Sequence, residues 1–317
     1  MMIFSPKISF VIPVYNEEEV FDLLIKRLDA LMSKIESPCE VVLIDDGSID
    51  NTPVLMENIA TKHHNYQAIF LTRNFGHQRA LSAGLEHARG EVIMILDGDL
   101  QDPPELFFEF YEHIKKGYDV AYGVRKERKE SAIKRASYNA FYRILNKISN
   151  YPIPKDSGDF GMITRRVMDN MNKMREESRF LRGIRSWVGY RQIGVPYERK
   201  ERAAGVPKYS FKMLFKLAYD GIFNFSVFPI KVLTYLGVLC ISVSIIYFIL
   251  TLVKRLFYDS VPSGFTALLF MILLFGGVQL LSIGIIGEYV QRIFFQVKNR
   301  PLYLISKKII NGNKTLD

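Results

Sequence analysis

Cysteine and tryptophan are scarce in this chain, whose 317 residues include two cysteines and one tryptophan. Cys39 and Cys240 lie in different regions, the second inside an apolar run, which excludes a disulfide framework and a cysteine metal site. No Gly-x-Gly-x-x-Gly and no Gly-x-x-x-x-Gly-Lys-Ser/Thr pattern is present, so neither a dinucleotide-binding motif nor a P-loop is expected. No signal-peptide pattern precedes the first apolar run, and we expect a cytosolic main domain.

Charge is missing from two long stretches, between Lys231 and Lys254 and between Asp259 and Glu288. Each can supply the roughly 20 apolar residues that span a bilayer core. They predict two transmembrane helices, about 231–253 and 264–287, joined as a hairpin. Lysine and arginine are more numerous on either side of the hairpin than in its loop, which predicts that both termini are cytoplasmic. The alternative is a pair of buried helices in a soluble core.

The net charge of +9 suits an anionic membrane surface or phosphorylated substrates, and with membrane segments present we expect no nucleic-acid partner. Glycines in the second span would let helices approach closely, so a homo-oligomer stays open. Lysines alternate with aromatic residues before the hairpin, which favours interfacial helices over an amphipathic helix packed on the soluble domain. The predicted organisation is a cytosolic domain (1–207), interfacial amphipathic helices (208–229), two transmembrane helices (230–289) and a cytosolic C-terminal tail (290–317).

Strand and helix patterns alternate over the first 120 or so residues. Apolar runs predict strands at 8–14, 40–45, 67–71 and 92–96, with helices between them. Repeated βα units imply an α/β fold with a mainly parallel, doubly wound sheet, whose ligands bind at the carboxyl ends of the strands. The polar motifs follow these strands: Pro13-Val-Tyr-Asn-Glu17, Asp45-Asp-Gly-Ser48, Arg73-Asn-Phe-Gly76 and Asp97-Gly-Asp99.

Asp97 and Asp99 follow the fourth predicted strand. If the extended backbone continues, both carboxylates point to the same side. Two hard oxygen ligands suit Mg²⁺ or Mn²⁺ that also binds phosphate oxygens, so we expect chemistry on a nucleotide diphosphate. The alternative is a polar turn after a buried strand.

Four ordered motifs, Val11–Glu17, Asp45–Ser48, Arg73–His77 and Asp97–Glu105, resemble the inverting family 2 glycosyltransferases that use polyprenyl phosphates. The similarity is greatest to bactoprenol (undecaprenyl phosphate) glucosyltransferases, which are related to dolichyl-phosphate mannose synthase, and it extends from about residue 8 to residue 300. It implies a GT-A fold of Rossmann-like type, a nucleotide-sugar donor, a Mg²⁺ or Mn²⁺ ion, and transfer of one sugar to a lipid phosphate.

The resemblance also implies roles for individual residues. The donor would bind at the strand ends, and the metal ion at the acidic motif. The implied nucleotide-sugar residues are Pro13, Tyr15, Glu17, Ile44, Asp46, Asp97, Gly98, Arg202 and Lys208, and the implied metal ligands are Asp97, Asp99 and Gln101. Read alone, Glu17 equally suits a partner of a helix dipole.

Two basic segments suit phosphate groups. By resemblance, Arg125 and Arg135 hold phosphates of the acceptor or donor, because an arginine fork binds phosphate through two hydrogen bonds. The alternative, a solvated basic loop, stays open for the neighbouring residues 126, 128 and 129. Arg202 to Lys208 resembles a segment that closes over the donor diphosphate, with Pro207 in place of the usual small hydroxyl residue.

Asp159 and Asp156 resemble an acidic motif on the acceptor side. A phosphate nucleophile is already anionic, so we expect Asp159 to orient the sugar or acceptor and to stabilise oxocarbenium-like charge. Asp156 is the competing candidate, and both aspartates also suit a loop turn. The family pattern continues with arginine where this chain has Gly161.

These expectations combine into an enzyme of the inner (plasma) membrane. It would transfer one sugar, glucose first, from a UDP-sugar to undecaprenyl phosphate with inversion, for glycosylation of the cell envelope. A processive polysaccharide synthase is one rival, but Arg185-Ser-Trp187 lacks the usual Gln-x-x-Arg-Trp context. The others are a non-catalytic nucleotide-binding membrane scaffold and a pore, which two uncharged spans line poorly.

Overall fold

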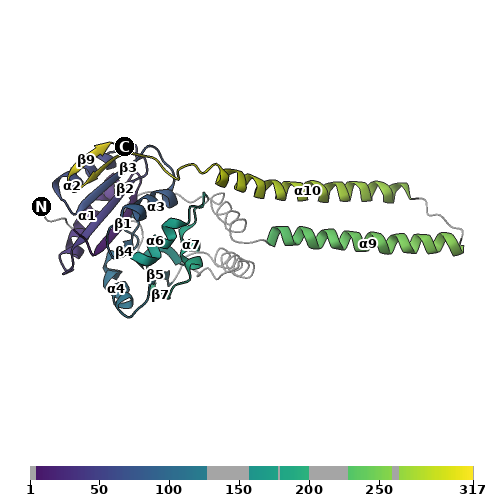
Figure 1. The fold of residues 1–317 in the computed structure, drawn as a ribbon, viewed down its shortest axis with the longest axis horizontal. Helices are drawn as coiled ribbons and strands as arrows, with labels where there is room; N and C mark the ends of the chain where they lie inside the picture. The colour runs from purple at the N-terminus through teal and green to yellow at the C-terminus, as the bar shows by residue number, and fades with distance from the viewer. Residues whose placement is uncertain (1–4, 127–156, 178, 200–227, 259–263, 317) are drawn as a thin grey trace. The chain divides into compact units, whose positions relative to one another are not determined.

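The computed structural model describes residues 5–126, 157–177, 179–199, 228–258 and 264–316. The chain divides into two compact units. One contains the described residues up to 199 and those from Pro301 onward, and the other contains two long helices (Figure 1). The predicted interfacial helices of 208–229 lie almost wholly outside the described residues.

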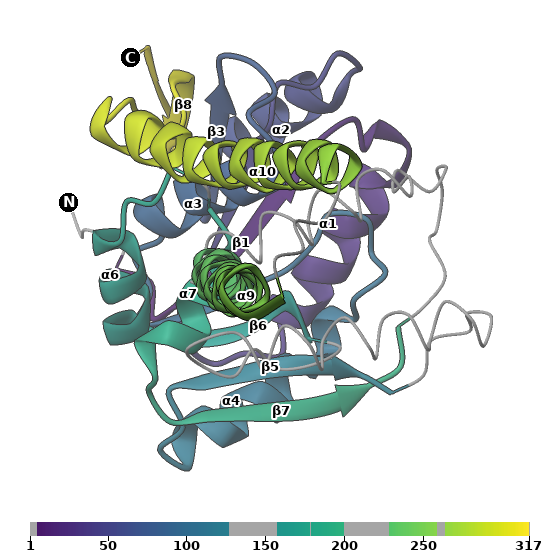
Figure 2. The ribbon, with the colours of Figure 1, turned by 90° about the vertical axis from the view of Figure 1, so that its right-hand side faces the viewer.

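A mixed sheet forms the centre of the first unit (Figure 2). Its strands, in the order in which they lie side by side, are β7 (Gln192–Tyr197), β5 (Val120–Arg125), β6 (Ser157–Thr164), β4 (Val92–Ile95), β1 (Ile8–Val14), β2 (Cys39–Asp45), β3 (Tyr66–Leu71), β8 (Ile305–Ile310) and β9 (Asn313–Leu316). The four predicted strands pair parallel, in the order β4-β1-β2-β3. The strands β5 and β7, which were not predicted, also pair parallel. The strands β6, β8 and β9 pair antiparallel, so the complete sheet is mixed.

Helices cover both faces of this sheet. On one face α1 (Glu18–Met32), α2 (Thr52–Lys62) and α4 (Phe107–Lys115) share an apolar cluster with Phe10 and Ile12 of β1. On the other face α3 (His77–His87), α6 (Arg165–Lys173) and α7 (Leu181–Val188) pack with Val11 of the same strand. Successive side chains of a strand point to opposite faces, so a continuous apolar run serves both cores.

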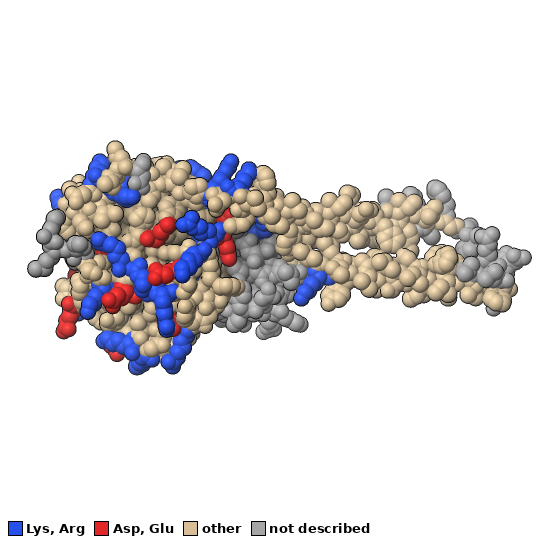
Figure 3. Space-filling model, in the orientation of Figure 1, with Lys and Arg blue, Asp and Glu red and all other residues tan. Residues whose placement is uncertain are grey.

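The second unit consists of α9 (Phe228–Tyr258) and α10 (Phe265–Val297). Two windows are long and apolar enough to cross a membrane, Pro229–Thr251 with mean hydropathy 2.3 and Leu274–Val297 with mean hydropathy 1.2. Neither window is buried inside the protein, unlike the core helices of a soluble protein. In Figure 3 these helices are almost free of charged side chains. The second window begins later than the predicted span of 264–287.

The C-terminal residues return to the first unit. β8 pairs antiparallel with β3, and the backbone N–H of Thr72 donates to Leu304 O at 3.0 Å. The turn before β9 is Asn311-Gly312, with φ of 52° and 77°, the left-handed pair that favours a tight hairpin. Residues 290–317 were expected to form a separate C-terminal tail, but β8 and β9 within this range join the sheet.

Candidate active site

The loops after β1 and β2 bind each other. Val14 and Asp45 are register partners at the ends of these parallel strands. The N–H of Asn16 donates to Ser48 Oγ at 2.9 Å, and its side-chain oxygen accepts from the N–H of Ile49 at 2.9 Å. Nearby, Tyr15 and Glu17 are half-buried. Both remain within reach of a ligand, as the predicted nucleoside pocket requires.

Three residues predicted for the nucleoside pocket are buried. Ile44 is 0% exposed and belongs to the apolar cluster under α3, and Pro13 is also buried. Their side chains pack in the interior, so their place beside a nucleoside stays a prediction. The Asp46 carboxylate accepts hydrogen bonds from the backbone N–H groups of Phe75 and Gly76, at 2.8 and 3.0 Å. It holds the loop before α3, and burial raises its pKa.

The acidic motif forms a turn. β4 ends at Ile95, residues 98 and 99 turn, and Leu100 adopts a φ of 59°. The condition for a shared face, that the extended backbone continues past the strand, is therefore not met. Instead the backbone N–H of Gln101 donates to Asp99 Oδ1 at 3.1 Å, a side-chain-stabilised turn.

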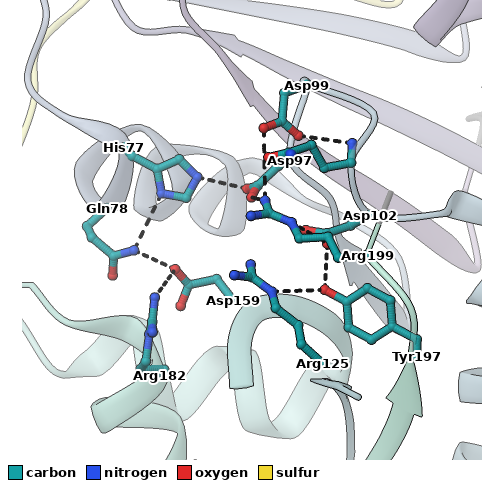
Figure 4. Close-up of polar contacts among 11 residues, drawn as sticks. His77, Gln78, Asp97, Asp99, Asp102, Arg125, Asp159, Arg182, Tyr197 and Arg199 are labelled. Carbon is teal, nitrogen blue, oxygen red and sulfur yellow. Dashed lines mark hydrogen bonds and ion pairs between the residues drawn. The ribbon is translucent and has the colours of Figure 1, made fainter. Parts of the chain in front are cut away.

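This turn still brings its carboxylates to one point. The Arg199 guanidinium lies 3.7 Å from Asp97 Oδ2, 3.9 Å from Asp99 Oδ2 and 3.1 Å from Asp102 Oδ1 (Figure 4). Asp102 is 1% exposed and also accepts a 2.5 Å hydrogen bond from the Tyr197 hydroxyl. The carboxyl end of β7 and the residues after it thus supply the partners for the turn that follows β4.

The donor set fits a divalent ion that arrives with a diphosphate. No group of three or more His, Cys, Asp or Glu side chains forms a complete metal cage within the part of the chain that the structure describes. Asp97 and Asp99 nevertheless lie around one cationic group, which shows that both can face a shared positive charge. Mg²⁺ is usually held by one or two carboxylates, with phosphate and water oxygens in its other positions.

His77, the first residue of α3, pairs with this cluster. Its Nε2 lies 3.0 Å from Asp97 Oδ1. Burial lowers the pKa of His77, but the hydrogen bond and charge of Asp97 outweigh it and raise the pKa to about 9. Burial raises the pKa of Asp97, yet His77 and nearby arginines lower it to about 2. The pair is charged at neutral pH.

A second polar cluster surrounds Asp159 of β6. Its Oδ2 accepts from Gln78 Nε2 at 2.6 Å and lies 3.8 Å from the Arg182 guanidinium (Figure 4). Arg185, 3% exposed, donates to Gly158 O at 3.3 Å. Its positive charge also acts on Asp159, and burial lowers the arginine pKa to about 10.

Gly161 has no room for the arginine of the family pattern. A Cβ at this position would lie 2.6 Å from Ala121 O and 2.9 Å from Tyr122 Cα. Close pairing of β5 with β6 therefore requires the glycine.

Of the basic residues predicted to bind phosphate, Arg125 lies in the described part of the chain and donates from Nε to the Tyr197 hydroxyl at 3.4 Å. Four further predictions lie outside the described residues: Arg135, Asp156, Arg202 and Lys208.

Comparison with known proteins decides the family. Residues 9–171 match the model of glycosyl transferase family 2, and residues 228–293 match the GtrB C-terminal hairpin. The chain belongs to glycosyl transferase family 2. The predictions of a glycosyltransferase with a GT-A-type α/β domain and an apolar C-terminal hairpin are confirmed.

Full-length relatives of this family 2 member support the assignment. The uncharacterized glycosyltransferase YkcC of Bacillus subtilis (strain 168) is 41% identical over 97% of this chain and 96% of its own length. The SfII prophage-derived bactoprenol glucosyl transferase of Shigella flexneri is 39% identical over 97% and 99%, respectively. Similarity to solved structures is weaker. The mannosyltransferase PcManGT from Pyrobaculum calidifontis, in complex with GDP-Man and Mn²⁺, is 20% identical, with a TM-score of 0.45 over 68% of this chain and 61% of that chain.

Several polar residues of this family 2 domain were not predicted as site residues. They come from segments distant in sequence and include His77, Gln78, Asp102, Arg182, Tyr197 and Arg199. A run of charged residues over 198–201, directly before the predicted diphosphate segment, was a usable signal for Arg199. No local pattern indicates Gln78: apart from a 3.4 Å contact with the neighbouring His77, its side-chain partners lie 81 and 103 residues away.

Proposed function

We propose that this enzyme transfers a single sugar, glucose as the first candidate, from a UDP-sugar to a polyprenyl phosphate with inversion. Relatives named bactoprenol glucosyl transferases match almost the whole chain and support this acceptor and sugar. Two features of one chain together carry the proposal. The carboxylates of Asp97 and Asp99, which follow β4, both face the Arg199 guanidinium. The C-terminal hairpin is apolar enough to cross a membrane.

The donor diphosphate would bind at the turn after β4. Asp97 and Asp99, with Gln101, would hold a Mg²⁺ or Mn²⁺ ion, which when bound neutralises negative charge on the departing diphosphate. Arg199 adds a fixed positive charge beside them. Tyr15 and Glu17 would contact the nucleoside, because an aromatic face and a carboxylate can bind a base and a ribose hydroxyl. By resemblance, Arg202 and Lys208 would cover the diphosphate.

The acceptor would approach on the side of Asp159. An oxygen of the lipid phosphate forms a bond to the anomeric carbon while the bond from that carbon to the diphosphate oxygen breaks, and UDP leaves. The phosphate is already anionic, so the reaction needs no strong base. Asp159, held by Gln78 and Arg182, would orient the sugar and stabilise developing positive charge. Arg125 and, by resemblance, Arg135 would bind the phosphate.

The membrane topology is also a proposal. After α9 and α10 the chain returns to pair β8 with β3 of the catalytic sheet. Two crossings bring the chain back to its starting side, so both ends of the hairpin lie on the side of the catalytic domain. Basic residues flanking the hairpin support the proposal that this side is the cytoplasmic side of the plasma membrane.

Mass spectrometry of the product tests the function. Purified full-length protein in lipid nanodiscs is incubated with undecaprenyl phosphate, Mg²⁺ or Mn²⁺, and one UDP-sugar at a time. We expect a lipid phosphate carrying one hexose, strongest with UDP-glucose. Longer glycan chains would indicate a processive synthase. Binding of UDP-sugar without any product, under every metal condition, would indicate a non-catalytic scaffold.

A further inference from the structure

The Gln78 amide connects three elements of the catalytic domain. It lies in the first turn of α3, donates from Nε2 to Asp159 Oδ2 on β6 at 2.6 Å, and accepts at Oε1 from the N–H of Leu181 on α7 at 2.8 Å. A backbone N–H can only donate, so the amide oxygen must face Leu181 and the NH₂ group must face Asp159. The contact with α7 therefore fixes the orientation of the amide.

The two oxygens of Asp159 have different surroundings. Oδ2 accepts a hydrogen bond from Gln78 Nε2 and lies 3.8 Å from the Arg182 guanidinium. Oδ1 is buried and has no hydrogen-bond partner in the described part of the chain. A buried carboxylate oxygen without a donor costs free energy, which a ligand donor would recover. Oδ1 is thus the oxygen that remains for a ligand.

We propose that Gln78 is a positioning residue for Asp159, an inference that rests on the proposed function. By holding Oδ2, the amide keeps Oδ1 directed to the bound substrate. The group that Oδ1 accepts from is a hydroxyl of the donor sugar, because an anionic phosphate would be repelled by the carboxylate. Gln78 acts on the reaction through Asp159, in the manner of residues that orient a catalytic side chain. Its Nε2 also lies 3.4 Å from His77 Nδ1, and an Asp159→Asn background separates the two contacts.

The substitution Gln78→Glu separates positioning from folding. It keeps the side-chain length and an acceptor for the Leu181 N–H, but it sets a carboxylate against Asp159 Oδ2. We expect the melting temperature to stay near the wild-type value. Repulsion turns Asp159 away, so kcat for sugar transfer should fall by about 10- to 100-fold, with a smaller change in the KM for UDP-glucose. Gln78→Ala should lower kcat less, since it removes the donor without adding repulsion.

Gln192→Glu is the matched control. Gln192 Nε2 donates to Arg185 O at 2.9 Å, so this variant adds the same charge to another amide that contacts α7, away from Asp159. We expect near-normal kcat. In an Asp159→Asn background, assayed with radiolabelled UDP-glucose, Gln78→Glu should cost less than about twofold, because the neutral amide of that background is not repelled.

The outcomes separate the two proposals. An inactive wild-type protein, across UDP-sugars and metals, overturns the proposed function and this inference with it. An active wild type with unchanged kcat in Gln78→Glu overturns only the positioning role. A loss of kcat that is equally large in the Gln192→Glu control, or that persists in full in the Asp159→Asn background, also overturns it, since the effect would then come from α7 rather than through Asp159.

Discussion

Replacing Arg199 by alanine should make the protein bind Mn²⁺ more tightly in the absence of nucleotide. The guanidinium lies 3.7 Å from Asp97 and 3.9 Å from Asp99, where it competes with a metal ion for the same carboxylates. Two unit charges about 4 Å apart attract by about 4 kcal/mol at an effective dielectric constant of about 20. The side chain is 25% exposed and also bonds to Asp102, so only part of this attraction opposes the ion. We expect about 1.4 kcal/mol, a roughly tenfold lower Kd.

Electron paramagnetic resonance measures this directly, because the signal of free aqueous Mn²⁺ falls as the ion binds. The titration uses the full-length protein in detergent without UDP-sugar. Arg191→Ala is the control: this exposed arginine stacks on Tyr118, 4.5 Å from the ring centre, and its loss changes the net charge equally. Arg199→Ala with unchanged or weaker Mn²⁺ binding, relative to this control, would refute the competition between guanidinium and metal.

Three further outcomes are expected. Asp99→Asn should abolish metal-dependent sugar transfer while the protein stays in the membrane fraction; near-normal turnover after rigorous metal removal and readdition would contradict the site. Glu40→Ala should destabilise the catalytic domain by about 3–5 kcal/mol, measured by denaturant unfolding, because Glu40 is 0% exposed and its loss removes the acceptor of the buried Ser9 and Gln67 side chains as well as of Arg89; a loss under about 1 kcal/mol would contradict this. Hydrogen bonds from two lysines of the C-terminal strands lower the pKa of Glu57 below its usual 4.5, so its stabilisation is present above that pH and lost as the pH falls through the lowered value. Glu57→Gln should therefore cost about 0.5 kcal/mol at pH 7, and progressively less as the pH falls below 4.5; a difference that does not change with pH would exclude this ion pair as its source.

The sequence predicted the parallel part of the sheet well, because strands buried on both faces read as continuous apolar runs. It did not decide between an extended backbone and a turn at residues 98–100, where the backbone stops being extended after the fourth strand. Successive side chains alternate between two faces only while the backbone stays extended. The left-handed backbone of Leu100 shows that it does not stay extended here. The carboxylates of Asp97 and Asp99 nevertheless lie close together, because both face the Arg199 guanidinium, which follows the end of β7.

The C-terminal strands were missed although a local signal existed. Asn-Gly at 311–312, between residues of β-forming type, is a strong hairpin signal. Two lysines inside β8 obscured its apolar pattern, and only one of its residues, Ile309, is fully buried. Contacts such as Gln78 with Asp159 and Leu181 are different, since they depend on the assembled fold and no spacing in the sequence encodes them.

The pairing of β8 with β3 means that the catalytic sheet can be completed only after the hairpin has been synthesised. A growing chain folds from its N-terminal end, so β4-β1-β2-β3 can assemble while the hairpin is still being made. Until residues 305–316 leave the ribosome, β3 presents an open edge, which in other proteins recruits foreign strands. The strands β8 and β9, which follow the hairpin in the chain, close that edge. Maturation of the catalytic domain therefore waits for the hairpin to be synthesised, and a chain that stops within the hairpin would keep an uncovered, aggregation-prone sheet.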